Sequence, residues 1–133
     1  MNEQQRAFTF DEAQQTQQEI CHGLSIENNP LEAFRRLQEE VAELGVAIET
    51  NNPTSIANEL GDIITLAATI ATQFNLMLSI AVGQKIQRNL AKYPPEVRDQ
   101  MLADGIPSDQ IFPILKSQWD TDRDKEFEYP FEG

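Results

Sequence analysis

The sequence predicts an all-α protein, an antiparallel bundle of four to five helices with an irregular C-terminal extension. Two matching start signals, Asn28-Asn29-Pro30 and Asn51-Asn52-Pro53, each place an asparagine cap before a proline in the first helical turn. Apolar residues recur at helical spacing after both signals, and no stretch indicates a strand. Since 133 residues suit one domain, we expect a single domain over residues 1–133, with core helices over about 10–92 and the irregular segment over about 96–133.

The first helix is predicted from Phe10 to about His22. Thr9-x-x-Glu12 has the spacing of a capping box, and Gly23 follows the expected end. At that end His22 is expected to be exposed rather than to ligate a metal. The middle of the helix is rich in glutamine, and such residues form a solvated face more often than they contact a ligand: Gln14, Gln15, Gln17 and Gln18.

Two longer helices follow, from Pro30 to about Glu49 and from Pro53 to about Phe74 or Asn75. The link between them is only a few residues long, so the two helices are expected to form an antiparallel hairpin. Gly61 lies in the interior of the second of these helices, where glycine costs about 1 kcal/mol relative to alanine. We therefore expect Gly61 to allow a close approach of the helices.

A fourth helix is predicted from Leu76 or Ser79 to about Lys92, and Tyr93-Pro94-Pro95 ends it. Its polar face is basic, and it either balances the acids of neighbouring helices or binds phosphate oxygens: Lys85, Arg88, Asn89 and Lys92. A short helix is expected from Glu96 to Asp104. Beyond it, Trp119 and the aromatic residues near the C-terminus are expected to pack on the bundle or on a second subunit, with a lid over a nucleotide base as the alternative: Phe127, Tyr129 and Phe131.

Four carboxylates occupy matching positions in the stretches LQEEVAEL and IANELGDI. Glu40 and Glu43 are three residues apart, as are Glu59 and Asp62, so each pair lies on one face of its helix. In both helices the first acid lies beside the apolar stripe, which occupies positions 34, 37, 41, 44 and 48 and positions 56, 63, 67, 70 and 74. Two helices packed through these stripes would point all four carboxylates at one place.

Composition excludes several classes of partner. The net charge of −12 argues against nonspecific binding to nucleic acid or to an anionic membrane, because both require a positive patch. No apolar run approaches the roughly 20 residues of a membrane span, and the N-terminus lacks the character of a signal peptide. The single cysteine, Cys21, fits a reducing cytoplasm.

The carboxylates favour a hard divalent cation. Each close pair of charges repels by roughly 4 kcal/mol at an effective dielectric constant near 20, so protons, basic partners or cations must offset the repulsion. Carboxylates without histidine or cysteine suit Mg²⁺, or Mn²⁺ as a substitute, better than zinc. A calcium loop at Asp120, Asp122 and Asp124 is rejected, because Lys125 stands where the loop needs glycine and Phe131 where it needs glutamate.

The acidic pattern resembles the signature of the all-α nucleoside triphosphate pyrophosphohydrolases, the MazG-like group. Glu39-Glu40-x-x-Glu43, followed on the next helix by Glu59-x-x-Asp62, carries the resemblance. The stretch KIQRNLAKYPPE is similar to a lysine- and asparagine-bearing helix that follows in many members. The resemblance covers roughly Leu31 to Glu96.

The resemblance implies a helical bundle, usually a homodimer or homotetramer, that hydrolyses a (d)NTP to the (d)NMP and pyrophosphate with Mg²⁺. It assigns metal ligation to Glu40, Glu43, Glu59 and Asp62. Glu39 matches the first acid of the motif but lies nearly opposite the apolar stripe, so it ranks below these four, and the proton acceptor is either Glu40 or Glu39. Phosphate binding falls to Lys85 and Asn89, with Arg88 as a further candidate.

Three functions stay open at this point. The first is nucleoside triphosphate pyrophosphohydrolysis in control or cleaning of the nucleotide pool. The second is hydrolysis of phosphoribosyl-ATP, or a dUTP-directed activity, by the same chemistry. The third is a non-catalytic acidic helical module for oligomeric interaction.

Overall fold

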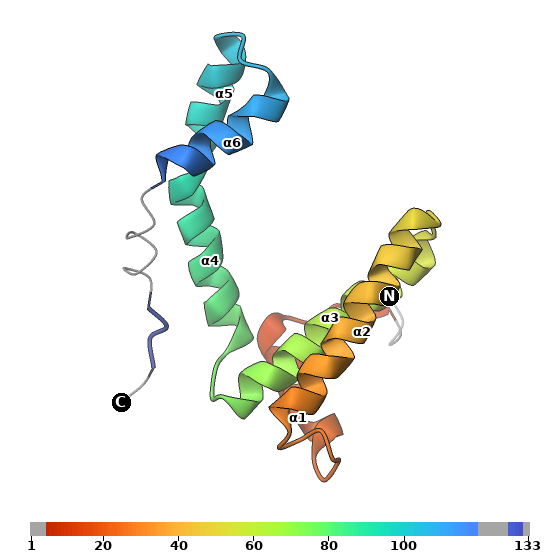
Figure 1. The fold of residues 1–133 in the computed structure, drawn as a ribbon. Helices are drawn as coiled ribbons and strands as arrows, with labels where there is room; N and C mark the ends of the chain where they lie inside the picture. The colour runs from red at the N-terminus through yellow and green to blue at the C-terminus, as the bar shows by residue number, and fades with distance from the viewer. Residues whose placement is uncertain (1–4, 120–127, 132–133) are drawn as a thin grey trace. The chain divides into compact units, whose positions relative to one another are not determined.

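The computed structural model describes residues 5–119 and 128–131, and this part of the chain contains six α-helices and no strand (Figure 1). The all-α prediction is confirmed. The helices are α1 (Phe10–Cys21), α2 (Pro30–Glu49), α3 (Pro53–Gln73), α4 (Leu78–Lys92), α5 (Pro95–Ala103) and α6 (Ser108–Gln118). They fall into two compact units, Met1–Ser79 and Ile80–Gly133. The expectation of one domain stays a prediction.

Helix α1 begins at the predicted capping box. The backbone N–H of Glu12 donates to Thr9 Oγ1 at 3.1 Å, and the backbone N–H of Thr9 donates to Glu12 Oε1 at 3.0 Å. Gly23 follows the helix with φ +80, a left-handed conformation that glycine adopts without strain. The exposed imidazole of His22 accepts or donates a bond to Glu27 Oε1 at 3.1 Å.

Helices α2 and α3 form the predicted antiparallel hairpin (Figure 1). Asn29 caps α2 by accepting from the N–H of Glu32 at 3.1 Å, and Asn52 caps α3 by accepting from the N–H of Ser55 at 3.2 Å. Asn51 has φ +51, which turns the chain sharply between the helices. The cap signals therefore locate both helix starts correctly.

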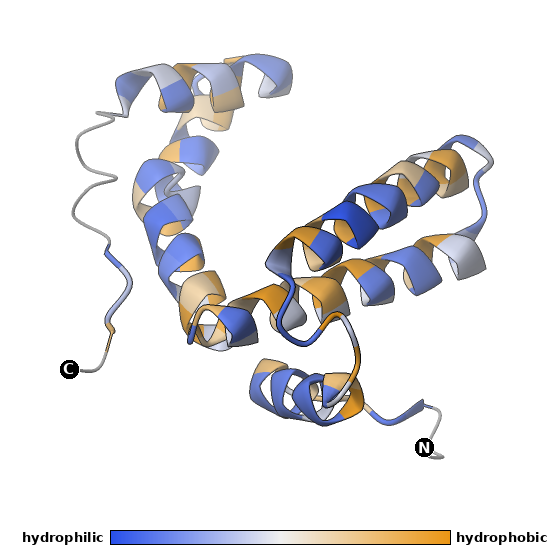
Figure 2. Cartoon of the chain, turned by 60° about the horizontal axis from the view of Figure 1, so that its bottom comes forward, coloured by the Kyte–Doolittle hydropathy of each residue, from blue (hydrophilic) through white to orange (hydrophobic). Residues whose placement is uncertain are grey.

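The first unit is packed through small side chains. Its buried residues are Cys21, Ile26, Ala33, Ala47, Ala68, Thr69 and Ala71. Large members of the predicted stripes stay half exposed, with Val41 at 52% and Ile48 at 59%, and Figure 2 shows apolar residues along the length of both hairpin helices. A Cβ at Gly61 would meet no described atom within 4 Å, so the expected close approach there is wrong.

Gln14 is not part of a solvated face. Its Nε2 donates to Thr72 Oγ1 at 3.1 Å and to the carbonyl of Leu76 at 2.7 Å, and its Oε1 accepts from the N–H of Leu78 at 2.8 Å. It thus joins α1 to the end of α3 and to the start of α4. The prediction is also wrong for half-buried Gln17, whereas the remaining two glutamines, Gln15 and Gln18, are exposed as expected.

The second unit contains most of α4 together with α5 and α6. Helix α5 matches the expected short helix, but α6 lies where an irregular segment was predicted. Ile111 and Leu115, four residues apart on α6, are buried, and the rings of Tyr93 and Phe112 stack with centroids 4.9 Å apart. Pro113 inside α6 made the segment look irregular.

The aromatic C-terminal residues are only partly described. Lys92 Nζ lies 5.9 Å from the centroid of the Trp119 ring, and the rings of Tyr129 and Phe131 are 4.8 Å apart. Phe127 and the three aspartates of the rejected calcium loop lie outside the described residues. In the described chain, no single helix is long and apolar enough to cross a membrane, and only α3 and the α4–α5 segment taken together as a bent pair reach that length and composition.

Candidate metal centre

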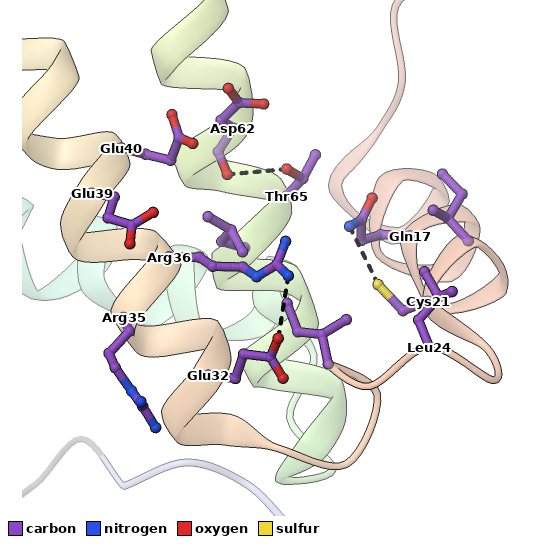
Figure 3. Close-up of a pocket in the computed structure, with 13 residues that line it drawn as sticks. Gln17, Cys21, Leu24, Glu32, Arg35, Arg36, Glu39, Glu40, Asp62 and Thr65 are labelled. Atoms are coloured by element: carbon purple, nitrogen blue, oxygen red, sulfur yellow. Dashed lines mark hydrogen bonds and ion pairs between the residues drawn. The ribbon is translucent and has the colours of Figure 1, made fainter.

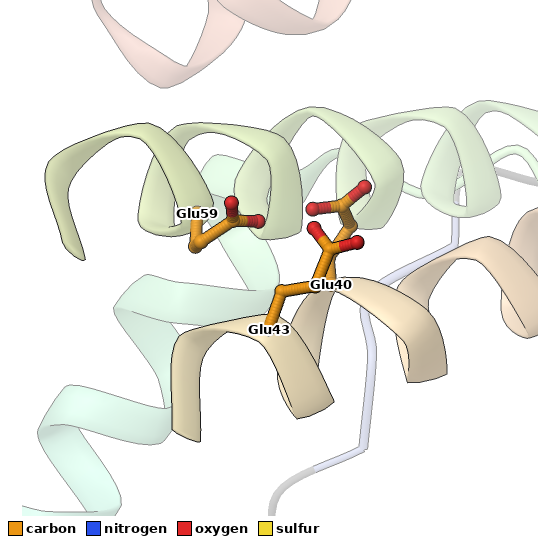
Figure 4. Close-up of side chains that lie close together, drawn as sticks. All are labelled: Glu40, Glu43 and Glu59. Carbon is orange, nitrogen blue, oxygen red and sulfur yellow. The ribbon is translucent and has the colours of Figure 1, made fainter. Parts of the chain in front are cut away.

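Three carboxylates converge between α2 and α3. Glu40 and Glu43 come from α2 and Glu59 comes from α3, and one oxygen of each lies within 4.8 Å of the other two (Figure 4). The three-residue spacing puts the first two on one face of α2, and the hairpin brings that face beside Glu59. The predicted convergence is thus present for three of the four acids.

The cluster contains buried carboxylate oxygens that lack a hydrogen-bond donor in the part of the chain that the structure describes. Glu40 and Glu59 are half buried, and the Oε2 atoms of both are buried without a hydrogen-bond partner among the described residues. A buried carboxylate oxygen in this state is unfavourable, because it has lost water and gained no donor. The site therefore has room for a proton or a cation.

The same crowding changes the acidity of Glu40. Contact with the Glu59 carboxyl, then burial, then the neighbouring Glu43 raises the pKa of Glu40 from its usual 4.5 to about 8. At neutral pH without a cation, Glu40 therefore keeps its proton most of the time. A bound cation would compete with that proton for the same oxygens.

Asp62 lies beside this cluster rather than within it. It lines a cavity of about 630 Å³ together with Glu39 and Glu40, and the cavity extends to α1 (Figure 3). Its opposite wall includes Ile20 and Leu24. Glu39 faces this cavity although it lies away from the apolar stripe, because the cavity is outside the hairpin core.

The basic residues predicted to bind phosphate lie on α4. Lys85 and Asn89 are exposed and Arg88 is half buried, and all three belong to the second compact unit. Their role toward the carboxylates stays a prediction.

Two arginines beside the carboxylates were missed by the sequence reasoning. Arg35 and Arg36 on α2 line the same cavity as Glu39 and Glu40. The available signal was spacing, since Arg36 precedes Glu40 by four residues and so lies one turn away on the same helix face.

The donor set fits a hard divalent cation. Carboxylate oxygens are the ligands that Mg²⁺ and Mn²⁺ prefer, and the two unsatisfied oxygens give such an ion a place to bind. Glu40, Glu43 and Glu59 would hold it, with Asp62 next to them at the cavity.

Comparisons with known proteins support the resemblance seen in the sequence. A family model described as the MazG nucleotide pyrophosphohydrolase domain matches residues 28–99, more than half of the chain. This range contains all five acids of the motif and the basic part of α4. Comparisons with curated proteins and with solved structures gave no match.

Proposed function

The chain belongs to the MazG family of nucleotide pyrophosphohydrolases, and from that premise we propose that it is a Mg²⁺-dependent nucleoside triphosphate pyrophosphohydrolase. It converts a (d)NTP and water to the (d)NMP and pyrophosphate. The water oxygen forms a bond to the α-phosphorus, and the bond from that phosphorus to the bridging oxygen of the β-phosphate breaks. Pyrophosphate leaves with that oxygen.

One observation carries the proposal: carboxylates from two helices converge, and two of their buried oxygens have no partner among the described residues. A structural role would be better served by a basic partner for each acid. An ion-binding role needs free carboxylate oxygens, which is the arrangement found here.

The chain's residues divide the work. Glu40, Glu43 and Glu59 would hold the cation, with Asp62 beside them as a further ligand, and Mn²⁺ could replace Mg²⁺. When bound, the ion supplies positive charge for the phosphates and lowers the pKa of water. Glu39, which lines the cavity but is outside the cluster of three, accepts the proton of the attacking water. Phosphate oxygens are bound by Lys85 and Asn89, with Arg88 as a further contact.

We also propose that the protein is a homodimer or homotetramer. Large apolar side chains on one side of the hairpin are exposed: Phe34, Val41, Ile48, Leu60 and Ile64. Two copies of this hairpin packed through that side would bury these side chains in a four-helix bundle. We expect Leu60→Lys to reduce the assembly to monomers on sizing, and Asn58→Lys, on the other side of α3, to leave it intact. A wild-type protein of monomer mass would contradict the proposal.

The activity is tested with purified protein, Mg²⁺ and a panel of canonical and deoxynucleoside triphosphates. We expect pyrophosphate and monophosphate, with ¹⁸O from labelled water in the monophosphate. Glu40→Gln and Glu59→Gln should abolish the activity, whereas Glu49→Gln, at the exposed end of the same helix α2, serves as the matched control and should retain it. Release of orthophosphate and diphosphate would show that a different bond breaks.

The same panel separates the assigned roles and the alternatives. Glu39→Gln should lower kcat and leave the Mg²⁺ dependence unchanged, whereas Glu40→Gln should weaken Mg²⁺ binding. Preferential turnover of dUTP or phosphoribosyl-ATP would assign the second function raised by the sequence, and inactivity of the wild type on every substrate would favour the non-catalytic module. With broad (d)NTP turnover, we propose control of the nucleotide pool in the cytoplasm.

A further inference from the structure

Arg36 is a cation inside the cavity that adjoins the acids. Its side chain extends from α2 across the cavity toward α3, whereas the neighbouring Arg35 points away from the cavity centre (Figure 3). The Nε of Arg35 donates back to the carbonyl of Leu31 on its own helix at 3.3 Å. Both arginines line the cavity, but only the side chain of Arg36 extends across it toward α3.

One ion pair holds the Arg36 side chain in place and leaves other N–H donors of the guanidinium available. One nitrogen, Nη2, donates to Glu32 Oε1 at 3.2 Å, and the same oxygen accepts from Ser25 Oγ at 3.3 Å. A guanidinium has five N–H donors in a planar fork, so this pairing leaves donors for an anion. The Arg36 side chain is 56% exposed, and it can exchange its partner without unfolding the helix.

Arg36 lies between the carboxylates and the apolar side chains that line the cavity. Glu40 and Asp62 lie on one side of it and Leu24 lies on the other, and Ile20 also lines the cavity. In a nucleoside triphosphate, the α-phosphoryl group joins the polyphosphate, which needs cations, to the nucleoside, which needs an apolar surface. The Cα atoms of Arg36 and Glu40 lie about 6 Å apart along the helix axis, so both side chains are within reach of a single phosphoryl group and its cation.

We propose that Arg36 binds the α-phosphoryl group of the nucleotide, the phosphate that stays with the nucleoside in the product. Glu32 holds the guanidinium in place when no nucleotide is bound and releases it when the phosphate arrives. This assignment rests on the proposed function, and it adds to that function a positioning residue on the same hairpin as the acids. The same assignment explains why Arg36, one turn from Glu40, pairs with Glu32 and not with Glu40.

The test compares Arg36→Ala with Arg35→Ala, a matched loss of charge one residue away. Arg36→Ala should raise KM for the triphosphate and Ki for the monophosphate product, each about tenfold or more, as expected for loss of a charge-assisted hydrogen bond. Inhibition by pyrophosphate should change less than about twofold. Arg35→Ala should resemble the wild type in all three constants, and Arg36→Lys should recover part of the loss.

A second variant distinguishes phosphate binding from a structural ion pair. Glu32→Gln releases Arg36, so KM should stay the same or fall, whereas a structural pair predicts that Glu32→Gln and Arg36→Ala have equal effects. Thermal unfolding checks that both variants fold. The proposal is overturned if the two arginine variants behave alike, if Glu32→Gln reproduces Arg36→Ala, or if pyrophosphate inhibition weakens while monophosphate inhibition does not.

Calorimetry of monophosphate binding in Mg²⁺ buffer separates this inference from the proposed function, because binding does not require turnover. A wild type that binds the monophosphate but releases no pyrophosphate would count against the reaction, and loss of that binding in Arg36→Ala alone would still support the phosphate contact. Equal binding by the wild type and both arginine variants, or binding by none of them, would overturn the contact.

Discussion

Cation binding at the carboxylate cluster should depend steeply on pH between 6 and 8. The cause is Glu40, whose pKa is raised to about 8 by the Glu59 carboxyl, by burial and by Glu43. Below that pH the cation must displace a proton before it can use both oxygens of Glu40. Raising the pH removes this competition without changing the protein.

The magnitude follows from the fraction of Glu40 that is ionised. With a pKa of about 8 this fraction is about 1% at pH 6 and about 50% at pH 8. Apparent affinity for the ion should therefore rise by about 50-fold over this range, and binding at pH 7 should release about 0.9 proton per Glu40.

The measurement is a calorimetric titration with Mn²⁺ or Mg²⁺ at pH 6, 7 and 8 in two buffers of different ionisation enthalpy. The difference between buffers counts the released protons. Glu40→Gln should bind more weakly and show a much flatter pH profile, while Glu49→Gln should follow the wild type. Equal affinity at pH 6 and pH 8 with no proton release would refute the reasoning, because Glu40 would then already be ionised.

Three further predictions concern stability. The folded-state pKa of Glu40 lies above its usual 4.5, so the metal-free protein binds an extra proton when it is folded. Its unfolding temperature should therefore fall as pH rises from about 4.5 through about 8. A rise across that window in the wild type but not in Glu40→Gln would contradict this prediction. Gln14→Ala removes bonds to Thr72 and to the backbone after α3, and should lower the free energy of unfolding by about 1–3 kcal/mol in urea. Exposed Gln15→Ala should change it by less than about 0.5 kcal/mol, and equal losses would show that Gln14 contributes nothing special. Thr9→Ala removes the cap of α1 and should cost about 1 kcal/mol, with Thr9→Ser as the control that keeps the cap.

The features that local sequence encodes were predictable. Each long helix begins at an asparagine followed by proline, and a cap depends only on residues within one turn. A short link fixes the hairpin, and the hairpin with two three-residue spacings brings Glu40, Glu43 and Glu59 together. Each of these features depends on residues that are near one another in the sequence.

The features that were missed depend on partners far along the chain. Gln14 forms hydrogen bonds with residues about 60 positions away, and the residues next to it in sequence do not indicate these partners. Arg36 lines a cavity only because α1 supplies the opposite wall. In α6 the spacing of Ile111 and Leu115 was a helical signal, but Pro113 between them outweighed it.

The pairing of Arg36 is the strongest indication that the cluster is kept for a ligand. A guanidinium one turn from Glu40 would relieve the repulsion among the carboxylates if it paired with them, yet it pairs with Glu32 at 3.2 Å. The Oε2 atoms of Glu40 and Glu59 meanwhile stay buried without partners in the described chain. If stability alone determined this arrangement, Arg36 would pair with the carboxylates of the cluster. The carboxylates of α2 and α3 therefore stay available for a divalent ion, and Arg36 of α2 stays available for a phosphate.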